Sequence, residues 1–110
     1  MSSPLLPNYL RANRKRLALS QDEVAFLLGN RSGGKVCRYE RFVRHPSLET
    51  ALAYEAIFKR SVSELFPGLY QNVEHQVAER AKVLAARKDG RLNRLAVRKR
   101  EALDGLAVMA

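Results

Sequence analysis

Residues 19–40 read LSQDEVAFLLGNRSGGKVCRYE, which places two short helical patterns on either side of a glycine. The first pattern opens with a capping box, because the Ser20 hydroxyl can accept from the Glu23 amide and the Glu23 carboxylate from the Ser20 amide. Gly29 follows at a turn that needs a positive φ angle, which a β-carbon disfavours. Ser32 is the predicted N-cap of the second helix. The stretch therefore predicts two helices joined through a glycine turn, over 21–28 and 33–42.

Signals for three further helices flank this pair and complete a compact all-α domain. Upstream, an apolar repeat predicts a helix over 9–17. Downstream, Ser47 is the predicted N-cap of a helix over 48–59. Residues 61–64 read SVSE, a second capping box that opens one or two helical turns ending at Pro67-Gly68. The predicted inward residues are Val36, Tyr39 and Glu40 in the third helix, and Leu48, Leu52, Ala56 and either Ile57 or Phe58 in the fourth.

The C-terminal part continues with a helical pattern over residues 69–88. Its narrow apolar stripe needs a covering surface, either a second copy of the chain or the preceding domain. Asp89-Gly90 interrupts the pattern, and a basic run follows over residues 91–100. We expect the tail, 89–110, to be partly ordered or disordered, and either to add non-specific phosphate contacts or only to aid solubility. The candidate dimerisation residues are Val73, Val77, Ala81 and Leu84.

Composition favours an anionic partner. The 110 residues hold 20 Lys and Arg against 11 Asp and Glu, a formal charge of +9, and the basic excess is mostly arginine, which suits phosphates and guanine edges. Nucleic acid is favoured over a membrane, because the chain lacks a transmembrane run and an amphipathic helix of membrane-surface type. The N-terminal residues do not form a secretory signal, so a cytoplasmic location is expected. Cys37 is the single cysteine, and neither a metal site nor a cofactor is expected.

An ordered series of motifs runs through the first half of the chain. Its members are Leu10-Arg11-x-x-Arg14, Leu19-Ser20-Gln21-Asp22-Glu23-Val24-Ala25, Leu28-Gly29, Ser32, Val36-Cys37-Arg38-Tyr39-Glu40 and Pro46-Ser47-Leu48-Glu49-Thr50. In this order they resemble the Xre family of phage-repressor-like and Cro-like helix-turn-helix proteins. The resemblance implies a compact five-helix, lambda-repressor-like domain over 8–68, followed by the C-terminal amphipathic helix and the basic tail.

The resemblance also implies roles in DNA binding. Gln21 and Ser32 are expected to touch phosphates, because both lie at predicted helix N-termini. Arg38 is expected to read a base, since a guanidinium can bond N7 and O6 of guanine together. Arg14 and Glu40 match a family pair that ties the first helix to the third, and Arg14 is also a candidate phosphate contact. The candidate base contacts are Gly33, Gly34, Lys35, Cys37 and Arg38, and the candidate phosphate contacts are Arg14, Gln21, Arg31, Ser32, Arg41 and Arg44.

Two features depart from the family pattern. Asn30-Arg31 lengthen the turn before the third helix, and Gly33-Gly34 stand where family members usually carry long polar side chains. The glycines leave few side chains to set specificity; alternatively, they let the backbone approach DNA closely, or they leave this end of the helix mobile until DNA orders it. Cys37 is interpreted as a small residue tolerated beside DNA, and a redox role is the alternative.

The favoured function is that of a transcriptional regulator, most simply a repressor that binds an inverted-repeat operator in double-stranded DNA as a homodimer. The alternative is a protein-interaction module, an antitoxin or antiactivator, that keeps the fold and binds a protein partner. An enzyme is not expected, because the sequence lacks an acid/base constellation, a phosphate-cradling loop and a metal-ligand set.

Overall fold

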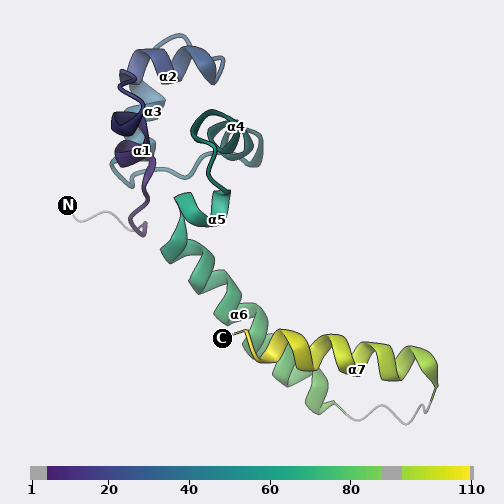
Figure 1. Ribbon diagram of the computed structural model, residues 1–110. Coiled ribbons are helices and arrows are strands. Elements are labelled where there is room, and N and C mark those ends of the chain that lie inside the picture. The colour runs from purple at the N-terminus through teal and green to yellow at the C-terminus, as the bar shows by residue number, and fades with distance from the viewer. Residues whose placement is uncertain (1–4, 88–92, 110) are drawn as a thin grey trace. The chain divides into compact units, whose positions relative to one another are not determined.

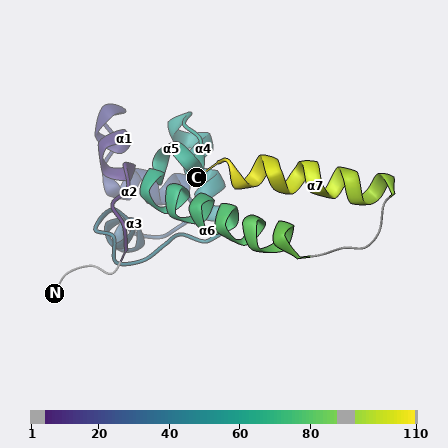
Figure 2. The ribbon, with the colours of Figure 1, turned by 90° about the horizontal axis from the view of Figure 1, so that it is seen from below.

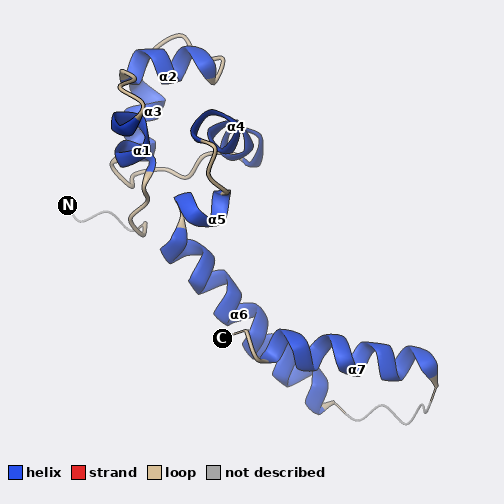
Figure 3. Cartoon of the chain, in the orientation of Figure 1, coloured by secondary structure: helices blue, strands red, loops and turns tan. Residues whose placement is uncertain are grey.

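The computed structural model describes residues 5–87 and 93–109, and all regular secondary structure in these residues is helical (Figure 3). The predicted all-α class is therefore confirmed. The chain divides into two units, Met1–Leu69 and Tyr70–Ala110. The helices are α1 (Leu10–Arg16), α2 (Gln21–Leu27), α3 (Gly34–Glu40), α4 (Leu48–Phe58), α5 (Val62–Leu65), α6 (Pro67–Ala86) and α7 (Arg94–Ala107).

The first unit encloses one apolar core. In it α2 packs against α3, α1 packs against both α3 and α4, and α4 packs against α5 (Figure 1). An aromatic cluster lies at the centre, where the ring centroid of Tyr54 is 6.2 Å from that of Tyr39 and 5.5 Å from that of Phe58. The buried core residues are Leu10, Val24, Ala25, Val36, Tyr39, Tyr54, Phe58, Leu65 and Phe66.

Local capping chemistry fixes most helix starts in this unit. The amide of Glu23 donates to the Ser20 hydroxyl over 3.0 Å, and the Ser20 amide donates to the Glu23 carboxylate over 2.8 Å. The second predicted capping box is also present, at the start of α5. Ser47 caps α4 by accepting from the Thr50 amide over 3.2 Å, and Gly29 has the predicted positive φ of 83°. These predictions are confirmed because each depends on neighbours along the chain.

The predicted inward face of α4 is wrong except at Phe58, which is buried as expected. Leu48 and Leu52 are 75% and 52% exposed and Ala56 is also exposed, whereas Ala51 and Tyr54 are buried. Apolar residues surround this helix on several sides, so the sequence pattern does not select one face. The rings of Tyr54 and Phe58 bury more apolar area than the leucines would, so the helix turns its aromatic side toward the core.

The C-terminal helices differ from their predicted extents. Pro67-Gly68, predicted to end the domain, instead begin α6, where the fixed φ of proline suits a first helical turn. Within the tail predicted to be partly ordered or disordered, α7 spans Arg94–Ala107, and Asn93 caps it by accepting from the Ala96 amide over 2.8 Å. The predicted interruption at Asp89-Gly90 and the first basic residue, Arg91, lie outside the described residues.

The second unit consists of most of α6 and all of α7, which turns back toward α6 (Figure 2). Arg100 joins the two helices by donating to the Ala85 carbonyl over 3.1 Å. Ala78 and Ala81 are buried in α6, while α7 contains no buried residue. Within 5–87 and 93–109, every helix is too short or too polar to serve as a membrane-crossing segment.

Candidate nucleic-acid interface

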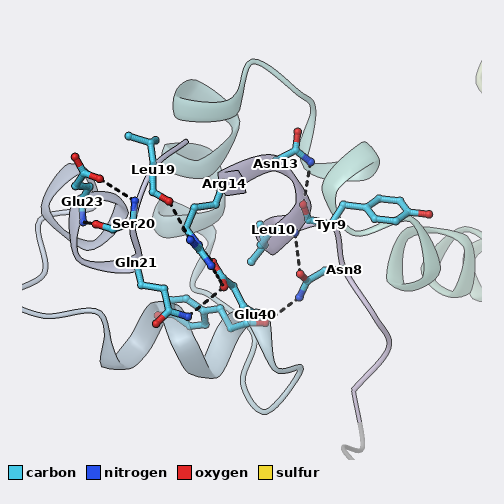
Figure 4. Close-up of polar contacts among 11 residues, drawn as sticks. Asn8, Tyr9, Leu10, Asn13, Arg14, Leu19, Ser20, Gln21, Glu23 and Glu40 are labelled. Carbon is cyan, nitrogen blue, oxygen red and sulfur yellow. Dashed lines mark hydrogen bonds and ion pairs between the residues drawn. The ribbon is translucent and has the colours of Figure 1, made fainter. Parts of the chain in front are cut away.

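A nearly buried ion pair holds the first three helices together. Arg14 donates from Nε to Glu40 Oε2 over 2.7 Å and from Nη2 to Oε1 over 3.1 Å, a bidentate geometry (Figure 4). The side chains of Arg14 and Glu40 are only 12% and 3% exposed. Gln21 adds a hydrogen bond from Nε2 to Glu40 Oε1 over 3.2 Å. The predicted scaffold pair is therefore confirmed, and it ties the end of α3 to α1 and to the start of α2.

The same pair engages two of the expected phosphate contacts in hydrogen bonds inside the domain. The third nitrogen of Arg14, Nη1, donates to the Leu19 carbonyl over 2.9 Å, so all three nitrogens are engaged inside the domain. Hydrogen bonding to Glu40 raises the pKa of Arg14 above its usual value, against the opposing effect of burial. Gln21 is partly buried and bonded to the same carboxylate. We assign Arg14 and Gln21 to the scaffold.

The start of α3 differs from the prediction. Ser32 is exposed and does not cap the helix; the residue at the N-cap position is Gly33, which has no side chain to offer. The amide of Gly33 instead donates to Asp22 Oδ1 of α2 over 2.8 Å. Gly33 is buried, so it is also withdrawn from the expected base contacts. Ser32 therefore lies one residue before the N-cap position, and a carboxylate from the neighbouring helix bonds the amide of the N-cap residue.

Asn8 also helps to position α3, a role that the sequence did not indicate. Its Nδ2 donates to the Tyr39 carbonyl near the end of α3 over 2.9 Å, and its Oδ1 accepts from the Leu10 amide over 3.0 Å (Figure 4). It thereby joins the end of α3 to the start of α1. The asparagine before the first helix is a typical capping signal, but its partner 31 residues away has no local signature.

The outward side of α3 and its flanking turns carry the remaining candidates. Gly34, Lys35 and Arg38 are exposed, whereas Val36, Tyr39 and Glu40 on the opposite side are buried. Cys37 is partly buried between the two sides. Ser32 is also exposed, in the turn before the helix. We define the basic face as the five exposed cations Arg31, Lys35, Arg38, Arg41 and Arg44.

The basic face has no neutralising partner within the part of the chain that the structure describes. Glu40 is the single acidic residue between positions 31 and 44, and Arg14 already neutralises it. The side chains of Lys35 and Arg38 make no hydrogen bond or ion pair with other described residues, and the same holds for the side chains of Arg41 and Arg44. Desolvation and charge repulsion both keep such cations extended into solvent, where a polyanion can reach them.

The candidate dimerisation residues are only partly available. Val73 and Val77, one helical turn apart in α6, are 47% and 37% exposed, and Leu84 is also exposed. Ala81 is 4% exposed, so it lies inside the second unit. The stripe predicted from the sequence therefore presents three of its four members to solvent.

Two other findings bear on the chemistry of the chain. Among the described residues, His, Cys, Asp and Glu side chains do not gather in threes that could hold a metal ion. Comparison with family models, curated proteins and solved structures returned no match. The function therefore has to be inferred from the residues and geometry of this chain.

Proposed function

We propose that this protein is a sequence-specific double-stranded DNA-binding protein, a cytoplasmic transcriptional regulator whose first five helices act as a helix-turn-helix domain. The observation that carries the proposal is the two-sided nature of α3. One side is fixed to the domain by its apolar core and the Arg14–Glu40 pair, and the other presents cations whose side chains have no partner among the described residues. A major groove admits one α-helix, and a rigidly held helix with an exposed basic side suits that geometry.

Individual roles follow from position on the basic face. Arg38, in the middle of α3, is assigned to base reading, and bidentate bonding to guanine N7 and O6 is worth about 1–3 kcal/mol of discrimination. Lys35 lies one turn earlier, and Gly34 leaves room for the backbone to approach the groove. Cys37 is placed at the margin of this contact. Phosphate contacts are assigned to Arg31, Ser32, Arg41 and Arg44, which flank the helix.

We further propose that the protein binds DNA as a homodimer. One seven-residue recognition helix reads few bases, so a second copy about 34 Å away on an inverted repeat would supply the missing affinity and specificity. The second unit is the proposed dimerisation element, because Val73, Val77 and Leu84 remain exposed. A unit whose buried helical residues are two alanines gains little stability by itself. Occupancy of a promoter by such a dimer would repress transcription by exclusion.

A protein-interaction role, as an antitoxin or antiactivator, is the second candidate. It is favoured by exposed apolar side chains on the first unit: Phe26 is 80% exposed, and Leu48 and Leu52 are exposed one turn apart on α4. Such side chains can anchor a protein partner. Gly33 and Gly34 at the start of α3 have no side chains, so this end of the helix can contact few DNA bases directly.

Salt dependence of DNA binding distinguishes the two candidates. Fluorescence anisotropy of a labelled duplex gives log K against log salt, and each phosphate contact adds about −0.9 to the slope. Arg41→Ala is expected to reduce the slope by about 1 while lowering affinity similarly for all sequences. Arg60→Ala, an exposed arginine in the same unit but outside the basic face, is the matched control and should leave the slope unchanged. Equal slopes for both variants would contradict the assigned interface.

A further inference from the structure

The first turn of α3 is held by a residue of another helix. In the same unit, α2, α4 and α5 each start with a serine whose side chain caps the helix. α3 has no side-chain cap of its own. The amide of its N-cap residue, Gly33, donates to the Asp22 carboxylate, 11 residues earlier in the chain. Because Asp22 lies in the first turn of α2, one hydrogen bond joins the starts of the two helices.

Close packing shows that this junction is built and is not a chance surface contact. A β-carbon on Gly33 would lie 2.9 Å from Asp22 Oδ1, closer than side chains tolerate, and 3.0 Å from Gln21 Cβ, a contact that would require the neighbour to shift. Gly33 has a φ of −75°, so the glycine is not required by backbone conformation. It is required by space. The adjacent Gly34 differs, because a β-carbon placed there would have Ser32 Oγ as its nearest neighbour, at 3.8 Å.

The junction is placed where it can control the basic face. Lys35 and Arg38 follow Gly33 within about one and a half turns, so a shift at the helix start moves both side chains. Two glycines give this start little intrinsic tendency to be helical. The other end of α3 is separately fixed by Glu40, which bonds Arg14 and Gln21. Gln21 and Asp22, neighbours in α2, thus hold the two ends of α3.

We propose that Asp22 is a positioning residue that orients α3 for reading DNA sequence, an inference that rests on the proposed function. The carboxylate acts through the Gly33 amide and does not itself touch DNA. Its negative charge opposes binding to phosphates, so its presence beside the basic face weakens non-specific affinity. Asp22 therefore raises the ratio of specific to non-specific binding by fixing α3, while its charge lowers the affinity for every duplex.

Three variants separate the hydrogen bond from the charge. Asp22→Ala removes both, and Asp22→Asn removes the charge but keeps an oxygen acceptor. Glu49→Ala is the control, because it removes an exposed acid from the first turn of a different helix, α4. The readout is the ratio of the Kd for a scrambled duplex to the Kd for the site that the wild type selects.

We expect Asp22→Ala to lower this ratio about tenfold, which corresponds to loss of one charge-assisted hydrogen bond. Asp22→Asn should keep the ratio within about threefold of the wild type and should bind the scrambled duplex more tightly. Glu49→Ala should keep the wild-type ratio. The proposal is overturned if Asp22→Ala keeps the wild-type ratio, or if Asp22→Asn loses as much as Asp22→Ala.

Amide hydrogen exchange tests the junction without DNA. In the wild type the Gly33 amide should exchange more slowly than that of exposed Gly34, and the slow exchange should persist in Asp22→Asn and disappear in Asp22→Ala. Equally fast exchange of the two glycines in the wild type overturns the proposal, even if Asp22→Ala does not fold. If the wild type selects no DNA site while Gly33 exchange depends on Asp22, the proposed function fails and the junction stands.

Discussion

Two adjacent glycines should respond in opposite directions to the same substitution. In Gly33→Ala the new methyl group would meet Asp22 Oδ1 at 2.9 Å, Gln21 Cβ at 3.0 Å and the Gln21 carbonyl carbon at 3.3 Å. The Gln21 carbonyl carbon is part of the α2 backbone, and Gln21 Cβ is fixed directly to that backbone, so neither atom can rotate away. In Gly34→Ala the methyl group has no neighbour closer than 3.8 Å. The first change therefore strains the helix pair, and the second does not.

The expected magnitudes differ in sign. Overpacking of this kind destabilises the folded state by about 1–3 kcal/mol. Replacing glycine also makes the unfolded chain less flexible, which stabilises the folded state by about 0.4–1 kcal/mol. The net loss for Gly33→Ala is about 1.3 kcal/mol, the midpoint of a range of about 0–2.6 kcal/mol. Gly34→Ala should stabilise by up to about 1 kcal/mol, because alanine is the better helix former. In a domain of this size each kcal/mol shifts the Tm by about 4–8 °C.

Thermal unfolding followed by circular dichroism at 222 nm measures both variants against the wild type. Gly33→Ala should melt several degrees below the wild type, and Gly34→Ala at or slightly above it. If the two variants melt at the same temperature, or if Gly33→Ala is the more stable, the close contact between the starts of α2 and α3 is not as described.

Three further predictions concern the core and the second unit. Glu40→Ala leaves the Arg14 guanidinium buried without its counter-ion, so urea unfolding should show a loss of about 3–5 kcal/mol; a loss below about 1 kcal/mol would argue against the pair. Tyr54→Phe removes a buried hydroxyl that has no hydrogen-bond partner among the described residues, so stability at pH 7 should be unchanged or slightly higher. Burial raises the pKa of Tyr54 above its usual value of 10.0. As the pH rises above about 10, the hydroxyl therefore ionises in the unfolded state before it ionises in the folded state. The free energy of unfolding of the wild type should then fall by up to about 1.4 kcal/mol per pH unit. Tyr54→Phe should lack this part of the alkaline loss, and an identical pH profile in both proteins would contradict it. Val77→Lys adds a charge at an exposed position of α6, so sedimentation equilibrium should show a folded monomer where the wild type is a dimer; a monomeric wild type would refute the dimer proposal.

Features that depend on short-range chemistry were predictable from the sequence. The two capping boxes and the glycine turn after α2 each require only residues within a few positions of one another. The inward side of α3 also followed from spacing, because Val36 and Tyr39 are apolar and the residues between them are small or basic.

Features that depend on distant partners were not predictable in this way. The hydrogen bond of Asp22 to Gly33 joins two helices across a turn, and a serine at position 32 offered a more obvious cap. The orientation of α4 was decided by how two aromatic rings fill the core, which the pattern of the helix itself does not reveal. α7 begins at a capping asparagine that the strong basic bias of its surroundings obscured.

The candidate site was predictable in part. The exposed cations follow from composition and spacing, whereas the Arg14–Glu40 pair came from resemblance to a family and not from spacing. Three expected contacts, Arg14, Gln21 and Gly33, make hydrogen bonds inside the domain. Their polarity suits either role, and only burial and partners distinguish the two.

Selection from a random double-stranded DNA pool at moderate salt tests the central claim most directly. The wild type, Arg38→Ala and the control Arg60→Ala are carried through the same rounds, and the enriched sequences are compared. The wild type and Arg60→Ala should enrich one inverted-repeat site containing a guanine in each half, and Arg38→Ala should lose the preference at that guanine. If the wild type enriches no sequence, or if Arg38→Ala enriches the same site as strongly, α3 is not the element that reads DNA.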